Sequence, residues 1–155
     1  MKSRWWATVD TATVGQRVMG TAPANFAQYV PADHHHVLPT PDGLDFTEAC
    51  ALPTGLLTEH GALTTGGYQP GQSLLITGAT SSIGLIGVQI ARAPGASPIV
   101  ATTRSAGKHN LLKQAGADTI VVTSEQDLTQ AVLDATAGEG VDLALDHIGG
   151  QTFAA

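Results

Sequence analysis

The chain of 155 residues is long enough to bury a hydrophobic core, and its 43% hydrophobic and 13% charged residues exclude a disordered polypeptide. A formal net charge of -6 argues against nucleic acid as a main partner, and no segment has the apolar length of a membrane span. The single cysteine, Cys50, excludes an internal disulfide, so we expect a reducing, cytoplasmic location.

The first third of the chain mixes short strand signals with loops. We expect strands at residues 16–20 and 25–31, the second because apolar and polar residues alternate around Phe26 and Tyr29. A loop rich in proline follows to Gly43. Asp45 and Glu48 have the spacing of a capping box, which predicts a helix start ahead of the Ala/Leu-rich stretch that reaches about Leu63.

From residue 73 onward, short apolar runs alternate with helical segments. The runs lie at 73–77, 98–102, 119–122 and 141–145, and the helices between them are expected at 83–93, 106–115 and 126–135. This alternation is typical of βαβ units in a parallel sheet. Right-handed crossovers leave few topologies, so we predict an α/β fold that contains part of a doubly wound Rossmann sheet.

A turn of small residues joins the first of these runs to its helix. Small side chains let the backbone approach a pyrophosphate, and free amides at a helix start donate to its oxygens. The strict G-x-G-x-x-G pattern is absent, because Ala79 and Ser81 stand where its first two glycines would be. An ordinary tight turn is therefore the alternative. The candidate phosphate-binding residues are Gly78, Ser81, Ser82, Ile83 and Gly84.

The end of the second run indicates which dinucleotide would bind. An NAD site usually has an acidic residue there, but no Asp or Glu occurs between Glu59 and Asp118. That interval holds four cations, Arg92, Arg104, Lys108 and Lys113. A planar fork from Arg104, a point charge from Lys108 and a hydroxyl from Thr103 or Ser105 suit a 2′-phosphate, which predicts NADPH. The alternative is that these are solvated residues at a helix start.

The fourth run ends in Asp146, His147, Ile148, Gly149 and Gly150. The carboxyl ends of strands face the ligand in doubly wound sheets, so Gly149 is a further candidate for close approach to the cofactor. His147 is a possible proton donor, although a solvated loop histidine is the simpler interpretation. The sequence assigns no catalytic residue.

These motifs together resemble one superfamily of enzymes. The resemblance rests on VGQRVMG at 14–20, FAQYV at 26–30, LPTPDGL at 38–44, ALP at 51–53, PGQSLLI at 70–76, AGAD at 115–118 and DHIGG at 146–150. In this order they look like the medium-chain dehydrogenase/reductase superfamily, and most like its zinc-independent quinone oxidoreductases. The resemblance covers nearly the whole chain after about Thr13.

The resemblance implies a remnant of a GroES-like catalytic domain at 1–55 and an incomplete Rossmann domain at 56–155, with the chain truncated at both ends. It implies hydride transfer from NADPH to an electrophilic carbon of a quinone or an enone. Lys108 would meet the 2′-phosphate and Thr58 would lie near the nicotinamide. Zinc-type relatives carry a cysteine where this chain has Thr54, so we expect no metal site there.

Other interpretations remain open. The turn after residue 76 also resembles the T-G-x-x-x-G-x-G turn of short-chain dehydrogenases, but both tyrosines, Tyr29 and Tyr68, lie upstream of it. The chain could be a non-catalytic nucleotide-binding fragment, or a relative of zinc-type alcohol dehydrogenases without the metal. Adjacent histidines point in different directions, so we do not expect the run His34–His36 to hold a metal ion. An incomplete sheet would leave an exposed edge through which copies of the chain could associate.

Overall fold

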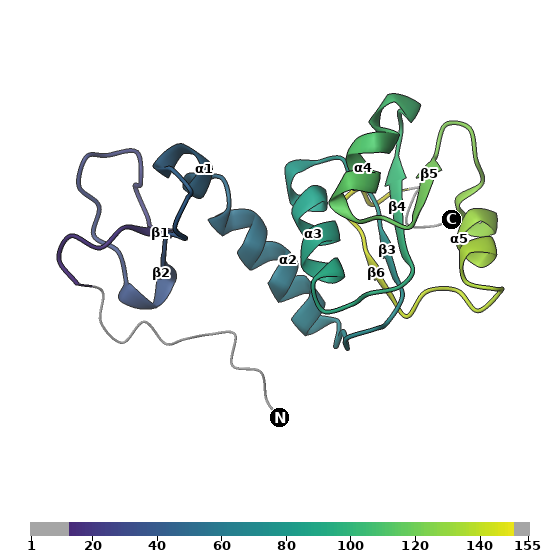
Figure 1. Ribbon diagram of the computed structural model, residues 1–155, viewed down its shortest axis with the longest axis horizontal. Helices are drawn as coiled ribbons and strands as arrows, with labels where there is room; N and C mark the ends of the chain where they lie inside the picture. Colours follow the sequence, from purple (N-terminus) through teal and green to yellow (C-terminus); the bar gives the residue numbers. More distant parts are fainter. Residues whose placement is uncertain (1–12, 151–155) are drawn as a thin grey trace. The chain divides into compact units, whose positions relative to one another are not determined.

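The computed structural model describes residues 13–150, which belong to two compact units, 1–54 and 55–155. In the first unit, β1 (Val18–Gly20) pairs antiparallel with β2 (Val37–Pro39), and Val18 lies opposite Pro39 (Figure 1). A short 3₁₀ helix, η1 (His34–His36), precedes β2, and the helix α1 (Phe46–Cys50) follows it. The capping box is confirmed, since Asp45 accepts from the Glu48 amide at 2.7 Å and Glu48 accepts from the Asp45 amide at 3.0 Å.

The second expected strand of this unit is wrong. Residues 25–31 form turns and bends, and the side chains of Phe26 and Tyr29 are 104% and 90% exposed. Alternation specifies a strand only where one face is buried and a neighbour pairs with the backbone, and neither condition holds at these two side chains. The partner of β1 lies instead at 37–39, inside the stretch expected to be a loop.

The second unit contains a four-stranded parallel sheet with the order β5-β4-β3-β6, which confirms the predicted Rossmann-like architecture. Its helices alternate with its strands as the sequence predicts. The elements in chain order are α2 (Pro53–Thr65), β3 (Leu74–Ile76), α3 (Ser82–Arg92), β4 (Ile99–Thr103), η2 (Ala106–Lys108), α4 (His109–Ala115), β5 (Thr119–Val122), α5 (Leu128–Ala135) and β6 (Leu143–Leu145). The Ala/Leu-rich stretch is divided between α1 and α2, and Pro53 begins α2, as expected for a proline at the first helical position.

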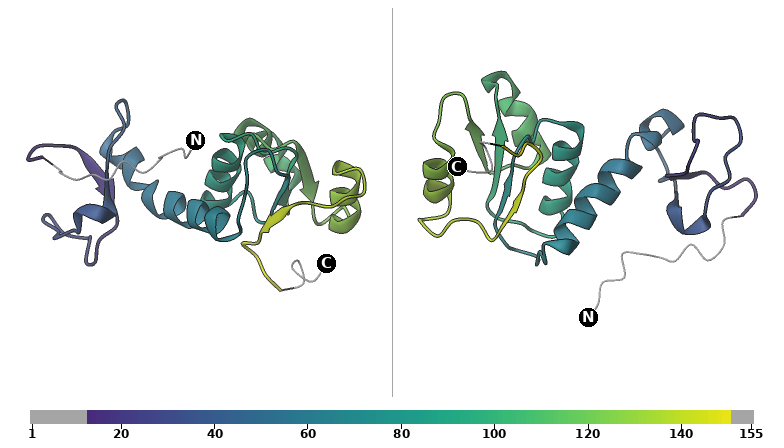
Figure 2. Two further views of the ribbon diagram at one scale, coloured as in Figure 1. Left: turned by 90° about the horizontal axis from the view of Figure 1, so that it is seen from below. Right: turned by 180° about the vertical axis from the view of Figure 1, so that it is seen from behind.

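The strand order reverses at β3. The chain steps from β3 to β4 to β5 in one direction, and α5 then returns it to β6 on the other side of β3. With right-handed crossovers, α3 and α4 cover one face of the sheet and α5 covers the other. The views in Figure 2 agree with this, because the strands lie between α3 and α5 in both. Doubly wound sheets bind ligands at the carboxyl ends of the strands beside such a reversal.

The core of this unit lies between the sheet and the helices. Every residue of β4 is buried, as expected for a central parallel strand that is covered on both faces. Leu74 and Ile76 of β3 and Val88 of α3 are completely buried in the same cluster. A packed core therefore supports the carboxyl ends of β3, β4 and β6.

Candidate dinucleotide-binding site

The turn after β3 is anchored to the end of β4. The Gly78 amide donates to the hydroxyl of Thr102 at 3.1 Å, and the Ala79 amide donates to the Thr102 carbonyl at 3.1 Å. Thr102 is completely buried, so both contacts are shielded from water. Within the turn, the Ser81 amide donates to the Gly78 carbonyl at 3.0 Å. These bonds fix the direction in which the chain enters α3.

Helix α3 begins with two free backbone donors. Ser81 is its N-cap, and the Ser81 hydroxyl oxygen accepts from the Gly84 amide at 3.0 Å. The amides of Ser82 and Ile83 have no acceptor within residues 13–150. The Gly84 amide is thus used by the cap, and Ser82 and Ile83 present the amides that could bind an anion at the helix start.

Two glycines are required by close packing at the turn. A Cβ on Gly84 would lie 2.6 Å from the Cα of Ala79, so no side chain fits there without a shift of the backbone. Gly78 has φ +59°, and a Cβ on it would lie 3.2 Å from the Cγ1 of Ile148. The glycines hold the turn close to α3 and to the segment after β6, and the turn presents backbone rather than side chains.

The end of β4 presents two cations without partners. Arg104 and Lys108 are exposed, and neither side chain has a polar partner in the part of the chain that the structure describes. The Thr103 hydroxyl is buried and accepts from the Ser105 amide at 3.2 Å, so its oxygen is engaged locally. Ser105 itself is exposed and makes no side-chain cap for η2. Of the two hydroxyls considered from the sequence, that of Ser105 is the accessible one.

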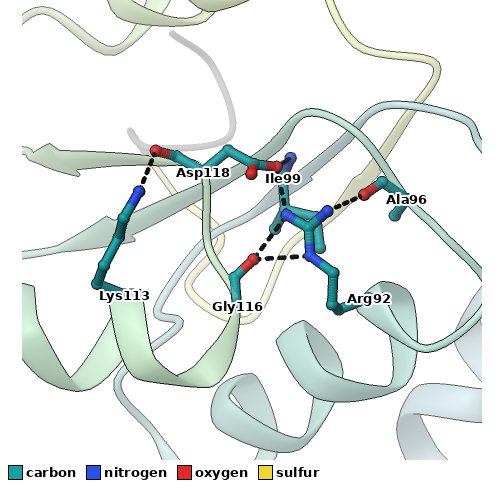
Figure 3. A network of polar contacts seen from close by, with 6 residues as sticks. All are labelled: Arg92, Ala96, Ile99, Lys113, Gly116 and Asp118. Atoms are coloured by element: carbon teal, nitrogen blue, oxygen red, sulfur yellow. Dashed lines mark hydrogen bonds and ion pairs between the residues drawn. The ribbon is translucent and has the colours of Figure 1, made fainter.

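Arg92 and Lys113, the other two cations between Glu59 and Asp118, lie at the opposite end of the sheet, beside the amino ends of the strands (Figure 3). The Arg92 guanidinium donates to the Gly116 carbonyl at 2.7 and 3.0 Å and to the Ala96 carbonyl at 2.6 Å, and it pairs with Asp118. Lys113 approaches the Asp118 carbonyl at 3.5 Å. Burial would raise the pKa of the Asp118 carboxyl, but hydrogen bonds from the Ile99 amide and from Arg92 hold it below the ordinary value.

The segment after β6 folds around Asp146. The Thr77 hydroxyl donates to the Asp146 carboxylate and lowers the pKa of that carboxyl below its ordinary value. The same carboxylate accepts from the Ile148 amide at 3.2 Å and from the Gly149 amide at 2.8 Å. The Gly149 amide is therefore engaged within its own turn, which leaves the small size of this residue as its possible contribution to a ligand site.

The amide and both ring nitrogens of His147 have partners, unlike those of a solvated loop histidine. Its amide donates to the Thr77 hydroxyl at 2.9 Å, its Nδ1 lies 2.9 Å from the Thr77 carbonyl oxygen, and its Nε2 lies 2.9 Å from Oε1 of Glu59. Sequence reasoning missed Glu59, Thr77 and Thr102 as supports of this site. The one available signal was Glu59, which is an acidic residue inside an Ala/Leu-rich helix. Thr58, its exposed neighbour on α2, makes no polar side-chain contact within residues 13–150.

A possible metal-ligand group lies elsewhere, in the first unit. Ligand atoms of Asp33, His34 and His35 lie within 4.8 Å of one another, and all three residues are exposed. The Asp33 carboxylate already accepts from the His35 amide at 2.9 Å and caps η1. Cys50 is exposed, and its thiol donates to the Thr47 carbonyl at 3.1 Å. The absence of a metal site stays a prediction.

The chain is similar to known oxidoreductases. The family model for zinc-binding dehydrogenases matches residues 82–155. The chain is 33% identical over 146 residues to a phenolphthiocerol/phthiocerol polyketide synthase component of Mycobacterium tuberculosis, covering 94% of this chain and 7% of that protein. It is 36% identical over 130 residues to the trans-enoyl reductase tazE of Aspergillus terreus, covering 79% of this chain and 42% of that one.

Solved structures agree with these relatives. The quinone oxidoreductase of Coxiella burnetii matches with a TM-score of 0.76 at 28% identity, over 92% of this chain and 44% of that chain. The Escherichia coli quinone oxidoreductase, solved in complex with NADPH, matches with a TM-score of 0.69 at 28% identity, over 77% and 36% of the two chains. This chain belongs to the medium-chain dehydrogenase/reductase superfamily.

The fold of the second unit is thus one that this chain shares with a superfamily of oxidoreductases. The relatives named above are considerably longer than this chain. It spans less than half the length of each of them. The matched family region begins after Cys50 and Thr54, so it does not test the expectation about zinc. None of the helices within residues 13–150 is both long and apolar enough to cross a membrane.

Proposed function

We propose that this chain is the cofactor-binding part of an NADPH-dependent reductase that transfers hydride from the nicotinamide to an electrophilic carbon of a quinone or an enone. The observation that carries the proposal is the pair Arg104 and Lys108, two exposed cations without polar partners in the described chain, next to a sheet end where α3 presents free amides. The quinone oxidoreductases and the enoyl reductase among its relatives support the substrate class.

The residues present fit such a cofactor. Gly78 and Gly84 leave backbone rather than side chains at the turn, and the amides of Ser82 and Ile83 suit a pyrophosphate at the start of α3. A 2′-phosphate needs positive charge, which Arg104 supplies as a planar fork and Lys108 as a point charge. An acidic residue at this strand end would repel a 2′-phosphate, and positions 103–108 contain none.

When bound, the cofactor supplies the hydride, and the residues of this chain bind and orient it. In this proposal the α3 amides fix the pyrophosphate, Arg104, Lys108 and the Ser105 hydroxyl fix the adenosine side, and Thr58 lies near the nicotinamide. We also interpret residues 1–55 as part of a GroES-like catalytic domain and expect the enzyme to act in the cytoplasm.

Titration of the purified chain with NADPH, with and without a quinone, tests this function. We expect quenching of the fluorescence of the reduced nicotinamide or a shift in its emission on binding, followed by loss of absorbance when the quinone is added. Binding without turnover would instead support a non-catalytic nucleotide-binding fragment. No binding at millimolar NADPH would contradict both. Size-exclusion chromatography in the same buffer would show whether copies of the chain associate, as an exposed sheet edge would allow.

A further inference from the structure

Glu59 is a buried carboxyl group that the proposed cofactor contacts do not use. It lies on α2 and is 0% exposed. Its Oε1 is 2.9 Å from Nε2 of His147, and its Oε2 has no hydrogen-bond partner in the described structure. A Cβ on Gly87 would lie 2.5 Å from this second oxygen, so Gly87 provides the space that Glu59 occupies. Burying a carboxyl group costs free energy unless it is compensated, and the compensation here comes from His147.

The hydrogen bonds of His147 imply that this pair holds a proton. A backbone carbonyl only accepts, so the contact of Nδ1 with the Thr77 carbonyl requires a hydrogen on Nδ1. The contact of Nε2 with Glu59 then needs one more proton, carried either by the imidazolium or by the carboxylic acid. Without that proton, a nitrogen lone pair would face a carboxylate oxygen at 2.9 Å. The contact therefore depends on a shared proton.

The pair joins three segments of the proposed cofactor site. Glu59 belongs to α2, Thr77 begins the turn after β3, and His147 follows β6. A Cβ on Gly78 would lie 3.6 Å from the Cβ of His147, so the histidine lies directly against the turn. Asp146 is a further charged group that faces this cluster, and it reaches it through the Thr77 hydroxyl. Only 20% of the His147 side chain is exposed.

We propose that Glu59 and His147 are positioning residues whose shared proton fixes residues 146–150 against the Gly78 turn and thereby supports dinucleotide binding. The part that concerns the dinucleotide rests on the proposed function, whereas the ordering of residues 146–150 does not. Replacement of the Glu59 carboxyl group by an apolar side chain should therefore lower the order of this segment.

Hydrogen exchange tests the ordering without any cofactor. Protection factors at residues 146–150 in the wild type should be well above those of an unfolded chain. In Glu59→Gln, the side-chain amide can donate to a neutral Nε2, so protection should remain. In Glu59→Leu, protection should fall about tenfold at every pH, which corresponds to ~1.4 kcal/mol.

Two controls keep this test decisive. Glu125→Gln removes an exposed carboxylate in the same way and should behave like the wild type. Protection of β4 amides reports whether each variant is folded. If Glu59→Leu does not fold, Glu59→Gln still decides the question, because a tenfold loss of protection in that variant, which keeps a hydrogen in the contact, would overturn the proposal. Unchanged protection in a folded Glu59→Leu would overturn it as well.

The same variants then connect the pair to the cofactor. We expect the dissociation constant for NADPH to be similar in the wild type and in Glu59→Gln and about tenfold higher in Glu59→Leu. If the wild type binds no NADPH, the proposed function fails while hydrogen exchange still decides the role of the pair. If the wild type binds and the variants match it at every pH, the positioning role fails alone.

Discussion

The two ends of the parallel sheet use similar residue types in opposite ways. At the amino ends of the strands, Arg92 pairs with Asp118 and donates to carbonyls, and Asp142 accepts from both the amide and the hydroxyl of Ser73. At the carboxyl ends, the amides of Ser82 and Ile83 and two cationic side chains have no partners in the described chain. The polar groups at the amino ends are thus used by hydrogen bonds within the protein, whereas these donors at the carboxyl ends are available for a ligand.

The largest effect should follow from removal of Arg92. Arg92→Ala leaves the Gly116 and Ala96 carbonyls without their charged donor and Asp118 without its pair. Hydrogen bonds to charged groups are worth ~1.5–3 kcal/mol, so the free energy of unfolding should fall by about 2–3 kcal/mol. Urea denaturation measures it. A loss below about 0.5 kcal/mol, typical of ordinary surface positions, would show that this end does not depend on the network.

A slightly smaller loss of stability is expected from a substitution in the turn between β3 and α3. Gly84→Ala places a Cβ 2.6 Å from the Ala79 backbone, so the turn must shift, at a cost of about 1–3 kcal/mol. Gly61→Ala is the matched control, because nothing lies within 4 Å of its Cβ position on α2. Alanine favours helix over glycine by about 0.8–1 kcal/mol, so the control should be stabilised. Equal stabilisation of both variants would contradict the close packing at Gly84.

The smallest effect is expected on the stability of the protein at acidic pH. The Ser73 hydroxyl and amide lower the pKa of Asp142 below its ordinary value. A carboxyl group with a lowered pKa in the folded state stabilises the protein at pH values above its pKa in the unfolded chain, which is about 3.9. This stability is lost as the pH falls through the pKa of the folded state. Asp142→Asn should therefore flatten the acid side of a stability profile measured by urea denaturation at successive pH values. An unchanged slope would show that the Ser73 contact does not discriminate between the charged and neutral carboxyl.

Local patterns predicted the second unit well. The four apolar runs became β3, β4, β5 and β6 because strands buried on both faces are continuously apolar. The same reasoning failed at 25–31, where alternation was not accompanied by burial, and at 37–39, where a proline and a histidine run concealed β2. Such short strands exist through their partners, which a local pattern does not contain.

Only the part of the candidate site that consecutive residues form could be predicted from the sequence. The turn and its helix follow directly from the order of residues 74–92. Its supports are distant along the chain, since Gly78 and Thr102 are 24 residues apart and Glu59 and His147 are 88 apart. The sequence also grouped four cations that the fold separates, with Arg92 and Lys113 placed around Asp118. Pairings of this kind follow from the strand order, which no single segment specifies.

The most direct test of the proposed cofactor site is the choice between NADPH and NADH in Arg104→Ala and Lys113→Ala. Both variants lose one exposed cation, but Lys113 lies beside Asp118 at the amino ends of the strands. Arg104→Ala should weaken NADPH binding by about 10- to 150-fold, equivalent to ~1.5–3 kcal/mol, and leave NADH binding unchanged. Lys113→Ala should change neither. Equal weakening of both cofactors by Arg104→Ala, or an effect of Lys113→Ala as large as that of Arg104→Ala, would contradict the assignment of Arg104 to the 2′-phosphate.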